Sequence, residues 1–262
     1  MTLLQAGASQ LYYELHDAQP GAERPTLVLM HGVGGNHGSW FHQVTAWRER
    51  YRLLAIDARG FGNSIDAERL GRDRFVDDLH AVLDAAQVGR AIFIGQSMGG
   101  GTALSYTLRH PERVAALVLA DTMFGIALSG EQRDRMAALT ARNAGLTQIQ
   151  RVLGPTCVAA QPAMATLYTT LASFNRANVR TLVGTQALHP PGQLAATGVP
   201  VLFLVGDEDV LFPPAEVQEV QRQVPGSDFV CLPASGHSAY FETPDAFNAA
   251  VLGWLAGRGI AL

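Results

Sequence analysis

Lysine is absent from this sequence, because all 19 basic residues among its 262 are arginine. The lack of a lysine amine excludes Schiff-base catalysis, serine–lysine catalysis and a P-loop that holds phosphate with a lysine. Cysteine is nearly absent too, since only Cys157 and Cys231 occur, far apart and outside any metal-binding motif. We expect both cysteines to be reduced thiols, and we expect neither a catalytic metal nor a cofactor.

Charged residues are also few, at 16% of the chain, and they form no block of one sign. With a formal net charge of -4, the sequence indicates neither a nucleic-acid partner nor binding to an anionic membrane. No apolar stretch approaches the roughly 20 residues that span a bilayer, and residues 1–5 lack the basic and apolar regions of a signal peptide. We therefore expect a cytoplasmic monomer or homodimer whose partner is a small-molecule substrate.

The chain does contain a series of apolar strands that alternate with helices. A hydrophobic content of 48% over 262 residues is enough for one large α/β domain. Amphipathic spacing, as over residues 73–87, predicts helices that lie against a sheet. We predict an α/β fold whose mostly parallel sheet of about eight strands is flanked by helices. Its strands include a weakly alternating antiparallel one at 10–15 and apolar runs at 26–30, 51–56, 92–94, 114–120, 200–205 and 229–232.

The pattern changes in the middle of the chain. Helical windows such as 131–143 and 163–174 occur there without a convincing strand, although the composition does not shift enough to indicate an independent domain. We predict a core made of residues 1–121 and 196–262, with a helical cap, residues 122–195, inserted between the two parts.

The most informative stretch follows the apolar run at 92–94. Gly95-Gln96-Ser97-Met98-Gly99 matches the G-x-S-x-G pattern, in which a serine occupies a tight turn between a strand and a helix. Glycine is needed on both sides because a Cβ there would collide with the neighbouring strand or helix. The pattern is short enough to arise by chance, but an apolar strand precedes it and a helical sequence at 101–109 follows. Ser97 is therefore our candidate nucleophile.

Candidate partners for this serine follow other predicted strands. In open α/β sheets, functional residues gather just beyond the carboxyl ends of the strands, where Val33, Asp209 and His237 also lie. Serine, acid and histidine occur in that order along the chain, which is the order of α/β-hydrolases. The other histidines lack metal-ligand spacing, and His31 is interpreted as structural.

The sequence resembles α/β-hydrolase-fold enzymes of the capped branch that includes esterases and enol-lactonases. The segments that carry the resemblance are spread over nearly the whole chain outside the predicted cap: His31-Gly32-Val33-Gly34-Gly35, Asp57-Ala58-Arg59-Gly60-Phe61-Gly62-Asn63-Ser64, Gly95 to Gly100, His110-Pro111-Glu112-Arg113-Val114, Gly206-Asp207-Glu208-Asp209, Gly236-His237 and Glu242 to Asn248. Within the second segment, Asp57 and Arg59 are expected to form a local ion pair.

The resemblance implies catalytic roles for these residues. Ser97 would attack a carbonyl carbon, His237 would take its proton, and an acid would orient the imidazole. Asp209 is our choice of acid because the family pattern places it three residues after a glycine that ends a strand. Asp207 in the same turn and Asp121 one strand earlier remain alternatives.

The glycine-rich loop 31–35 lacks the spacing of a dinucleotide-binding loop. We predict instead that the backbone N–H groups of Val33 and Met98 form an oxyanion hole. Arg176 and Arg180 in the predicted cap offer either a carboxylate-binding pair or an ordinary solvated face. Six side chains in or near loops after strand ends predict a largely apolar pocket, although core packing must account for some of them: Trp40, Phe41, Met123, Phe124, Phe212 and Tyr240.

The predicted function is cofactor-independent hydrolysis of a carboxylic ester or lactone of a small, mostly apolar substrate. One alternative is a hydrolase that cleaves C–C bonds in the ring-cleavage products of aromatic compounds. Such enzymes share the Ser-Met-Gly-Gly elbow, but their oxyanion loop differs from the Val33-Gly34-Gly35-Asn36 found here. The other alternative is a ligand sensor that keeps the triad and turns over slowly. A haloalkane dehalogenase is excluded because it needs an aspartate at the position of Ser97.

Overall fold

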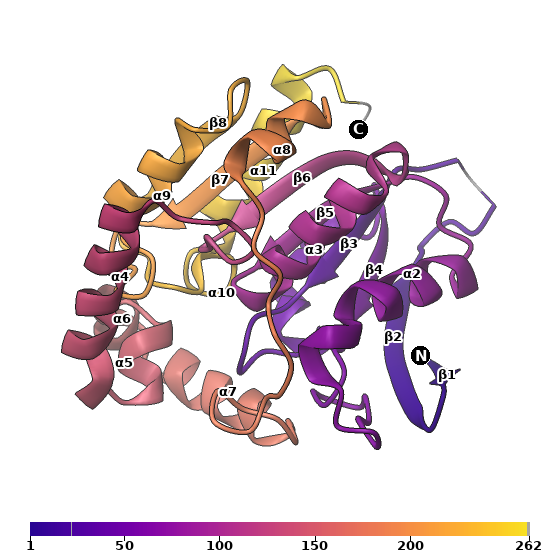
Figure 1. Cartoon of the computed structure of the whole chain (residues 1–262). Coiled ribbons are helices and arrows are strands. Elements are labelled where there is room, and N and C mark those ends of the chain that lie inside the picture. Colours follow the sequence, from indigo (N-terminus) through magenta and orange to yellow (C-terminus); the bar gives the residue numbers. More distant parts are fainter. Residues whose placement is uncertain (22, 261–262) are drawn as a thin grey trace.

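The computed structural model describes residues 1–21 and 23–260, and its centre is an eight-stranded sheet (Figure 1). The strand order is β1-β2-β4-β3-β5-β6-β7-β8. The first two pairings are antiparallel and all the others are parallel, so the predicted mostly parallel sheet is confirmed. The strands are β1 (Thr2–Ala6), β2 (Ser9–His16), β3 (Thr26–Met30), β4 (Arg52–Ile56), β5 (Ala91–Gln96), β6 (Val114–Ala120), β7 (Val201–Gly206) and β8 (Asp228–Leu232).

Strand β1 was not predicted from the sequence. It is an edge strand whose residues are mostly exposed, so it has no apolar run to mark it. It pairs with β2 through a tight turn at Gly7, whose φ of 63° lies in the left-handed region that glycine adopts easily.

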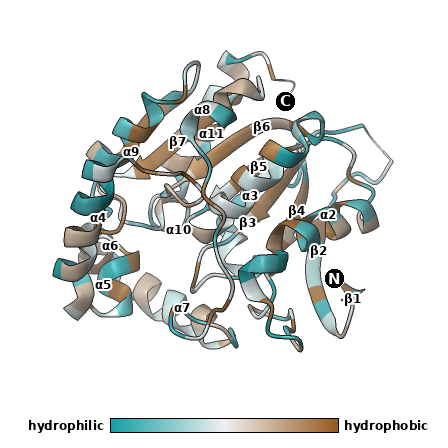
Figure 2. Ribbon diagram, in the orientation of Figure 1, coloured by the Kyte–Doolittle hydropathy of each residue, from teal (hydrophilic) through white to brown (hydrophobic). Residues whose placement is uncertain are grey.

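The central strands are mostly apolar because their residues contribute to two hydrophobic cores, one on each face of the sheet. Along β3, Val28 and Met30 belong to one core, whereas Leu27 and Leu29 belong to the other. This alternation follows from the two-residue period of a strand. Figure 2 shows the strands as a hydrophobic layer beneath helices that are more hydrophilic outside.

Helices cover both faces of the sheet. The first core includes side chains of α2 (Phe75–Ala85), α3 (Met98–Arg109), α8 (Pro191–Ala196) and α9 (Pro214–Gln221). The second core includes side chains of α1 (Phe41–Trp47), α10 (Ala239–Glu242) and α11 (Pro244–Gly257). The flanking helices predicted from the sequence are therefore confirmed. The described residues also form four short 3-10 helices: η1 (His37–Trp40), η2 (Gly71–Arg74), η3 (Pro111–Arg113) and η4 (Asn143–Gly145).

The segment between β6 and β7 is helical in its middle, from α4 to α7. Helices α4 (Gly130–Arg142), α5 (Gln148–Val152), α6 (Pro155–Ala160) and α7 (Pro162–Ser173) lie together at one end of the molecule (Figure 1). Residues 174–190 then run in front of α3 to α8 without forming a helix or strand. Helix α8 crosses the predicted end of the cap at residue 195, and its Leu194 is buried in the first core. Throughout the described residues, every helix is too short or too polar to span a membrane.

Candidate active site

Ser97 occupies the turn between β5 and α3, with φ 50° and ψ -117°. A non-glycine residue in this region is strained and persists only where its surroundings hold it there. The flanking glycines leave no room for side chains. A Cβ on Gly95 would lie 2.6 Å from the Cα of Gly100, and one on Gly99 would lie 2.4 Å from the Met30 carbonyl oxygen. The turn therefore places Ser97 at the carboxyl end of the sheet at the cost of local strain.

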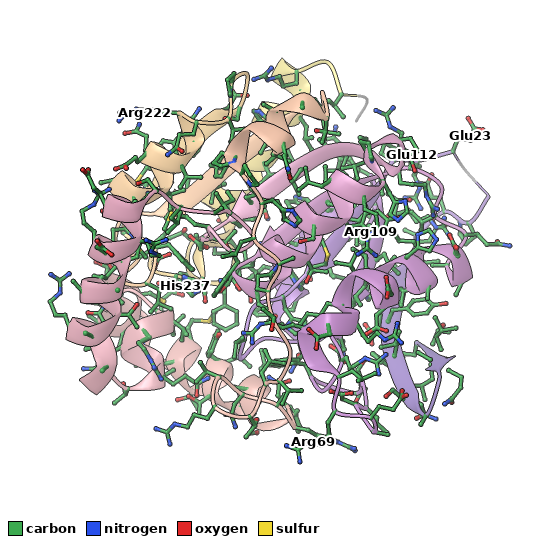
Figure 3. The ribbon with its side chains drawn as sticks, viewed as in Figure 1. Glu23, Arg69, Arg109, Glu112, Arg222 and His237 are labelled. Carbon is green, nitrogen blue, oxygen red and sulfur yellow. The ribbon has the colours of Figure 1, made fainter. Side chains whose placement is uncertain are left out.

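The structure brings Ser97, Asp209 and His237 together from three strand ends. His237 Nε2 lies 2.9 Å from Ser97 Oγ, and His237 Nδ1 lies 2.9 Å from Asp209 Oδ2. All three side chains are buried. With the imidazole proton on Nδ1, the ring donates to Asp209 and accepts from the serine hydroxyl. Figure 3 shows His237 inside the molecule, toward the end where α4–α7 lie.

The carboxylate of Asp209 is held by its own turn. Its other oxygen, Oδ1, accepts hydrogen bonds from the backbone N–H groups of Leu211 (2.7 Å) and Phe212 (3.0 Å). Burial by itself would lower the pKa of His237, but the charge of Asp209 and its hydrogen bond outweigh burial and raise that pKa. The arrangement therefore favours the imidazolium that forms when a serine proton is taken up.

We expect this raised pKa to be visible in the pH dependence of hydrolysis. Only neutral His237 can accept the serine proton, so activity should fall as the pH drops through a midpoint above the ordinary histidine value of about 6.5. The kcat/KM profile and NMR titration of the imidazole measure this midpoint. His31 is the control, because burial lowers its pKa. A His237 midpoint at or below the ordinary value would contradict the prediction.

The two alternative acids have other partners. Asp121 is fully buried, and its two oxygens accept hydrogen bonds from Gly206 N–H (3.0 Å) and Ala239 N–H (3.1 Å). Burial and the nearby charge of Asp209 raise the pKa of Asp121. Asp207 accepts a long bond, 3.4 Å, from a backbone N–H. Among the carboxylates of the described residues, Asp209 alone hydrogen-bonds the His237 imidazole, so the geometry favours it as the acid.

Glu242 organises the loop that carries His237, a role that was not predicted from the sequence. Its buried carboxylate accepts hydrogen bonds from the backbone N–H groups of Gly236 (3.0 Å), Ser238 (3.0 Å) and Gly154 (2.6 Å). Because Gly154 precedes α6, a single side chain joins the histidine loop to the helical segment after β6. The only sequence signal was its place in the 242–248 segment that resembles the family.

Gln96, the variable residue before the serine in the motif, was also missed. Its buried side-chain amide donates from Nε2 to the backbone carbonyl of His237 over 2.6 Å. A Cβ on Gly32 would lie 2.2 Å from the Oε1 of Gln96, so this amide also packs against the glycine-rich loop 31–35. The Gln96 side chain thus connects the serine turn to both the histidine loop and the glycine-rich loop.

Replacing Gln96 with methionine should lower kcat about tenfold and leave KM nearly unchanged. The variant keeps the side-chain length but leaves a buried carbonyl unpaired beside the imidazole, which allows His237 to shift. Gln43→Met is the matched control, because Gln43 is buried and donates in the same way to the Tyr240 carbonyl (2.9 Å). Kinetics and thermal unfolding of both variants separate positioning from stability. Equal loss of activity in the two variants would contradict the positioning role.

The predicted oxyanion donors lie on two adjoining segments. Within the described residues, neither the Val33 N–H nor the Met98 N–H donates to another protein group. The loop is close to the serine, because a Cβ on Gly32 would lie 2.8 Å from the Ser97 Cβ. Its turn requires Gly34, whose φ is 103°. Both N–H groups therefore remain available to a negative charge.

The predicted pocket residues fall into two groups. Phe124 and Phe212 meet edge to face at 5.2 Å between ring centroids, and the Phe212 ring lies 5.6 Å from the His237 ring. Trp40 and Tyr240 instead pack against each other in the second core, with ring centroids 4.2 Å apart, and they expose only 0% and 1% of their surface. The structure thus places Phe212 beside the histidine, with Phe124 packed against it, and places Trp40 and Tyr240 in the core.

Other predicted residues are spread over the surface and the core. Phe41 is partly buried and packs edge-on against Phe241 at 5.8 Å. Met123 is buried in the first core. Arg176 and Arg180 are exposed. Among the residues that the structure describes, no three histidine, cysteine, aspartate or glutamate side chains are grouped to hold a metal ion.

The expected ion pair between Asp57 and Arg59 does not form. Arg59 turns toward α2 and makes a buried two-point contact with Asp78, at 2.8 Å and 2.7 Å. Asp57 accepts hydrogen bonds from the backbone N–H groups of His37 (2.6 Å) and Asn63 (2.8 Å). The prediction was wrong because the two side chains point to different neighbours that are distant in sequence.

Residues 25–244 match the family model described as "alpha/beta hydrolase fold". The chain is 28% identical to the "Putative carbamate hydrolase RutD" of Caulobacter sp. (strain K31), with 95% of this chain and 96% of that protein aligned. It is 29% identical to the "Putative 2-succinyl-6-hydroxy-2,4-cyclohexadiene-1-carboxylate synthase" of Bacillus subtilis (strain 168), with 90% and 92% aligned.

Solved structures with the same fold include two named for their activity. A thermophilic esterase from Thermogutta terrifontis has a TM-score of 0.78 and 25% identity, with 97% of this chain and 95% of that one covered. The enol-lactonase from Burkholderia xenovorans LB400 has a TM-score of 0.76 and 22% identity, with 97% of this chain and 100% of that one covered. At this identity the likeness shows a shared fold and nothing about activity. The predicted family is confirmed: this chain belongs to the α/β-hydrolase family and is an enzyme of the hydrolase type.

Proposed function

We propose that this protein is a serine hydrolase that cleaves a carboxylic ester or a lactone, with a small and mostly apolar substrate. The observation that carries the proposal is the pair of 2.9 Å contacts that join Ser97 to His237 and His237 to Asp209. A serine hydroxyl is a weak nucleophile without a base, and this arrangement supplies an oriented base. The likeness to the esterase from Thermogutta terrifontis, at 25% identity, supports the same chemistry.

The proposed reaction proceeds through an acyl-enzyme. His237 Nε2 takes the proton as Ser97 Oγ attacks the carbonyl carbon. The resulting oxyanion accepts hydrogen bonds from the backbone N–H groups of Val33 and Met98. The amino end of α3 adds a favourable field there. His237 then protonates the departing alkoxide, which leaves as an alcohol or, in a lactone, as the free end of the opened ring. Water attacks the acyl-enzyme with the same base and releases the acid.

The aromatic pair beside the histidine supports an apolar substrate. Phe124 and Phe212 come from different segments, one after β6 and one after β7, and both are partly buried. Their edge-to-face contact forms an apolar wall near His237. Such a wall favours a hydrocarbon group on the substrate.

Turnover and covalent labelling of the wild-type protein test the proposal. We expect hydrolysis of p-nitrophenyl acetate and butyrate, together with one fluorophosphonate adduct per chain, located at Ser97 by peptide mass spectrometry. Folded protein that shows neither turnover nor labelling would refute serine hydrolysis. Labelling without turnover would refute ester hydrolysis of these substrates and favour C–C bond cleavage or a slow ligand sensor.

A further inference from the structure

A cleft of about 430 Å³ lies apart from the triad. It is bounded by the start of α2 with the preceding turn, by the outer side of α3, and by residues 185–189 of the segment that returns to α8. Its volume is within the range of small-molecule sites, about 300–1,000 Å³. Ser97, Asp209 and His237 are not among its lining residues. Figure 3 labels one residue of each site, with Arg109 on α3 and His237 in the interior.

The outer wall of the cleft is fastened at both of its ends. At one end the Arg72 backbone N–H donates to the Val183 carbonyl over 3.0 Å. At the other end His189 donates its backbone N–H to the Gly125 carbonyl (2.8 Å), and its Nε2 lies 3.2 Å from Ser105 Oγ. Figure 1 shows this segment crossing in front of α3. Hydrogen bonds therefore hold the outer wall of the cleft in place at both ends.

Among the described residues that line this cleft, Arg72 is a cation without an ion-pair partner. Arg109 forms an ion pair with Asp77 at 2.7 Å, and Asp73 accepts the Thr185 backbone N–H at 2.9 Å. The side chain of Arg72 is half-buried, and among the described residues its guanidinium forms neither a hydrogen bond nor an ion pair. Burial lowers its pKa, yet a guanidinium stays charged at neutral pH. A partly desolvated cation without a partner is costly, so a bound anion would stabilise it.

The other residues that line the cleft favour a singly charged anion with an apolar body. Phe75, Val76 and Leu108 provide apolar wall beside Arg72. The carboxylate of Asp73 also lines the cleft and disfavours a doubly charged group such as phosphate. A single carboxylate matches the planar two-point geometry of one guanidinium, and a hydrocarbon body would cover the apolar wall.

We propose that this cleft is a second ligand site that binds an organic monocarboxylate, with its carboxylate on Arg72 and its hydrocarbon against Phe75, Val76 and Leu108. The proposal stands independently of ester hydrolysis, because none of these residues belongs to the triad or its oxyanion donors. Binding can therefore be tested without any catalytic readout.

Calorimetric titration of the wild-type protein with 4-phenylbutyrate is the first test, and the uncharged 4-phenylbutyramide is the matched ligand. We expect saturable binding of one phenylbutyrate per chain at this cleft and at least about tenfold weaker binding of the amide, because the amide cannot form a charge-assisted pair with Arg72. Arg72→Gln should weaken phenylbutyrate binding to a similar degree. Arg69→Gln should leave it unchanged, because Arg69 is exposed and does not line the cleft.

Three results would overturn the proposal: no saturable binding of phenylbutyrate, equal binding of the acid and the amide, or equal binding by wild type and Arg72→Gln. The comparison of acid with amide needs no variant, so it stays decisive even if Arg72→Gln is unstable. Thermal unfolding of both arginine variants shows whether each is folded. Loss of esterase activity in any of these proteins would bear on the proposed hydrolysis and not on this site.

Discussion

Replacing Ser97 with alanine is expected to lower kcat/KM for p-nitrophenyl butyrate by about 10⁵-fold and to abolish fluorophosphonate labelling. The reason is that alanine leaves His237 and Asp209 in place but removes the only atom that can form the acyl-enzyme. The fold should survive, because the substitution removes only the serine hydroxyl and keeps the Cβ and its packing contacts. Initial rates and intact-mass measurements on the purified variant provide the test.

Ser9→Ala is the matched control for this experiment. Ser9 is as buried as Ser97 but lies on β2, where its hydroxyl contacts Glu68 and the Ala67 backbone N–H. We expect this variant to retain wild-type activity. Substantial ester hydrolysis that survives in Ser97→Ala would show that another group performs the chemistry and would remove the basis of the proposed function.

Asp209→Asn is expected to lower kcat by about 10³-fold or more, whereas Asp121→Asn should cost about tenfold at most. Asparagine at 209 removes the charge that holds the His237 pKa high, and its amide favours the wrong imidazole tautomer. Asp121 acts only indirectly, since its carboxylate accepts hydrogen bonds from the backbone N–H groups of Gly206 and Ala239 and forms none with the imidazole. An asparagine there keeps one of the two acceptors.

Steady-state kinetics of the two variants, measured at the same degree of folding, decide between the acids. A steep loss in Asp121→Asn with near-normal activity in Asp209→Asn would reverse the assignment. A similar loss in both would indicate that the two buried carboxyl groups work as a coupled pair, which the raised pKa of Asp121 next to Asp209 makes physically reasonable.

Much of the fold could be predicted because local chemistry and tertiary environment agree along the central strands. Nearly all residues of β3, β5, β6 and β7 are buried on one face or the other, so these strands are mostly apolar. The edge strand β1 has no such signal, since solvent covers most of its side chains. The need for glycine on both sides of Ser97 could be predicted, because the tight turn itself leaves no room for a Cβ at these positions.

The sequence alone determined which strand ends carry Ser97, Asp209 and His237, since motif and chain order are local or one-dimensional properties. Only the tertiary structure decided which of three carboxylates faces the imidazole, because Asp121, Asp207 and Asp209 have similar local sequence settings and differ in the backbone N–H groups that surround them.

The same physical reason explains the residues that were missed or misplaced. Gln96 and Glu242 act through hydrogen bonds to backbone atoms far away in the chain, which no local pattern records. Trp40 and Tyr240 follow strand ends, as pocket residues do, but pack on each other in the core. Arg72 is left without an ion-pair partner among the described residues because folding turns the neighbouring acids elsewhere: Asp73 accepts the Thr185 backbone N–H and Asp77 pairs with Arg109. Sequence therefore determined the elements and the reactive serine, while long-range packing decided which polar groups meet.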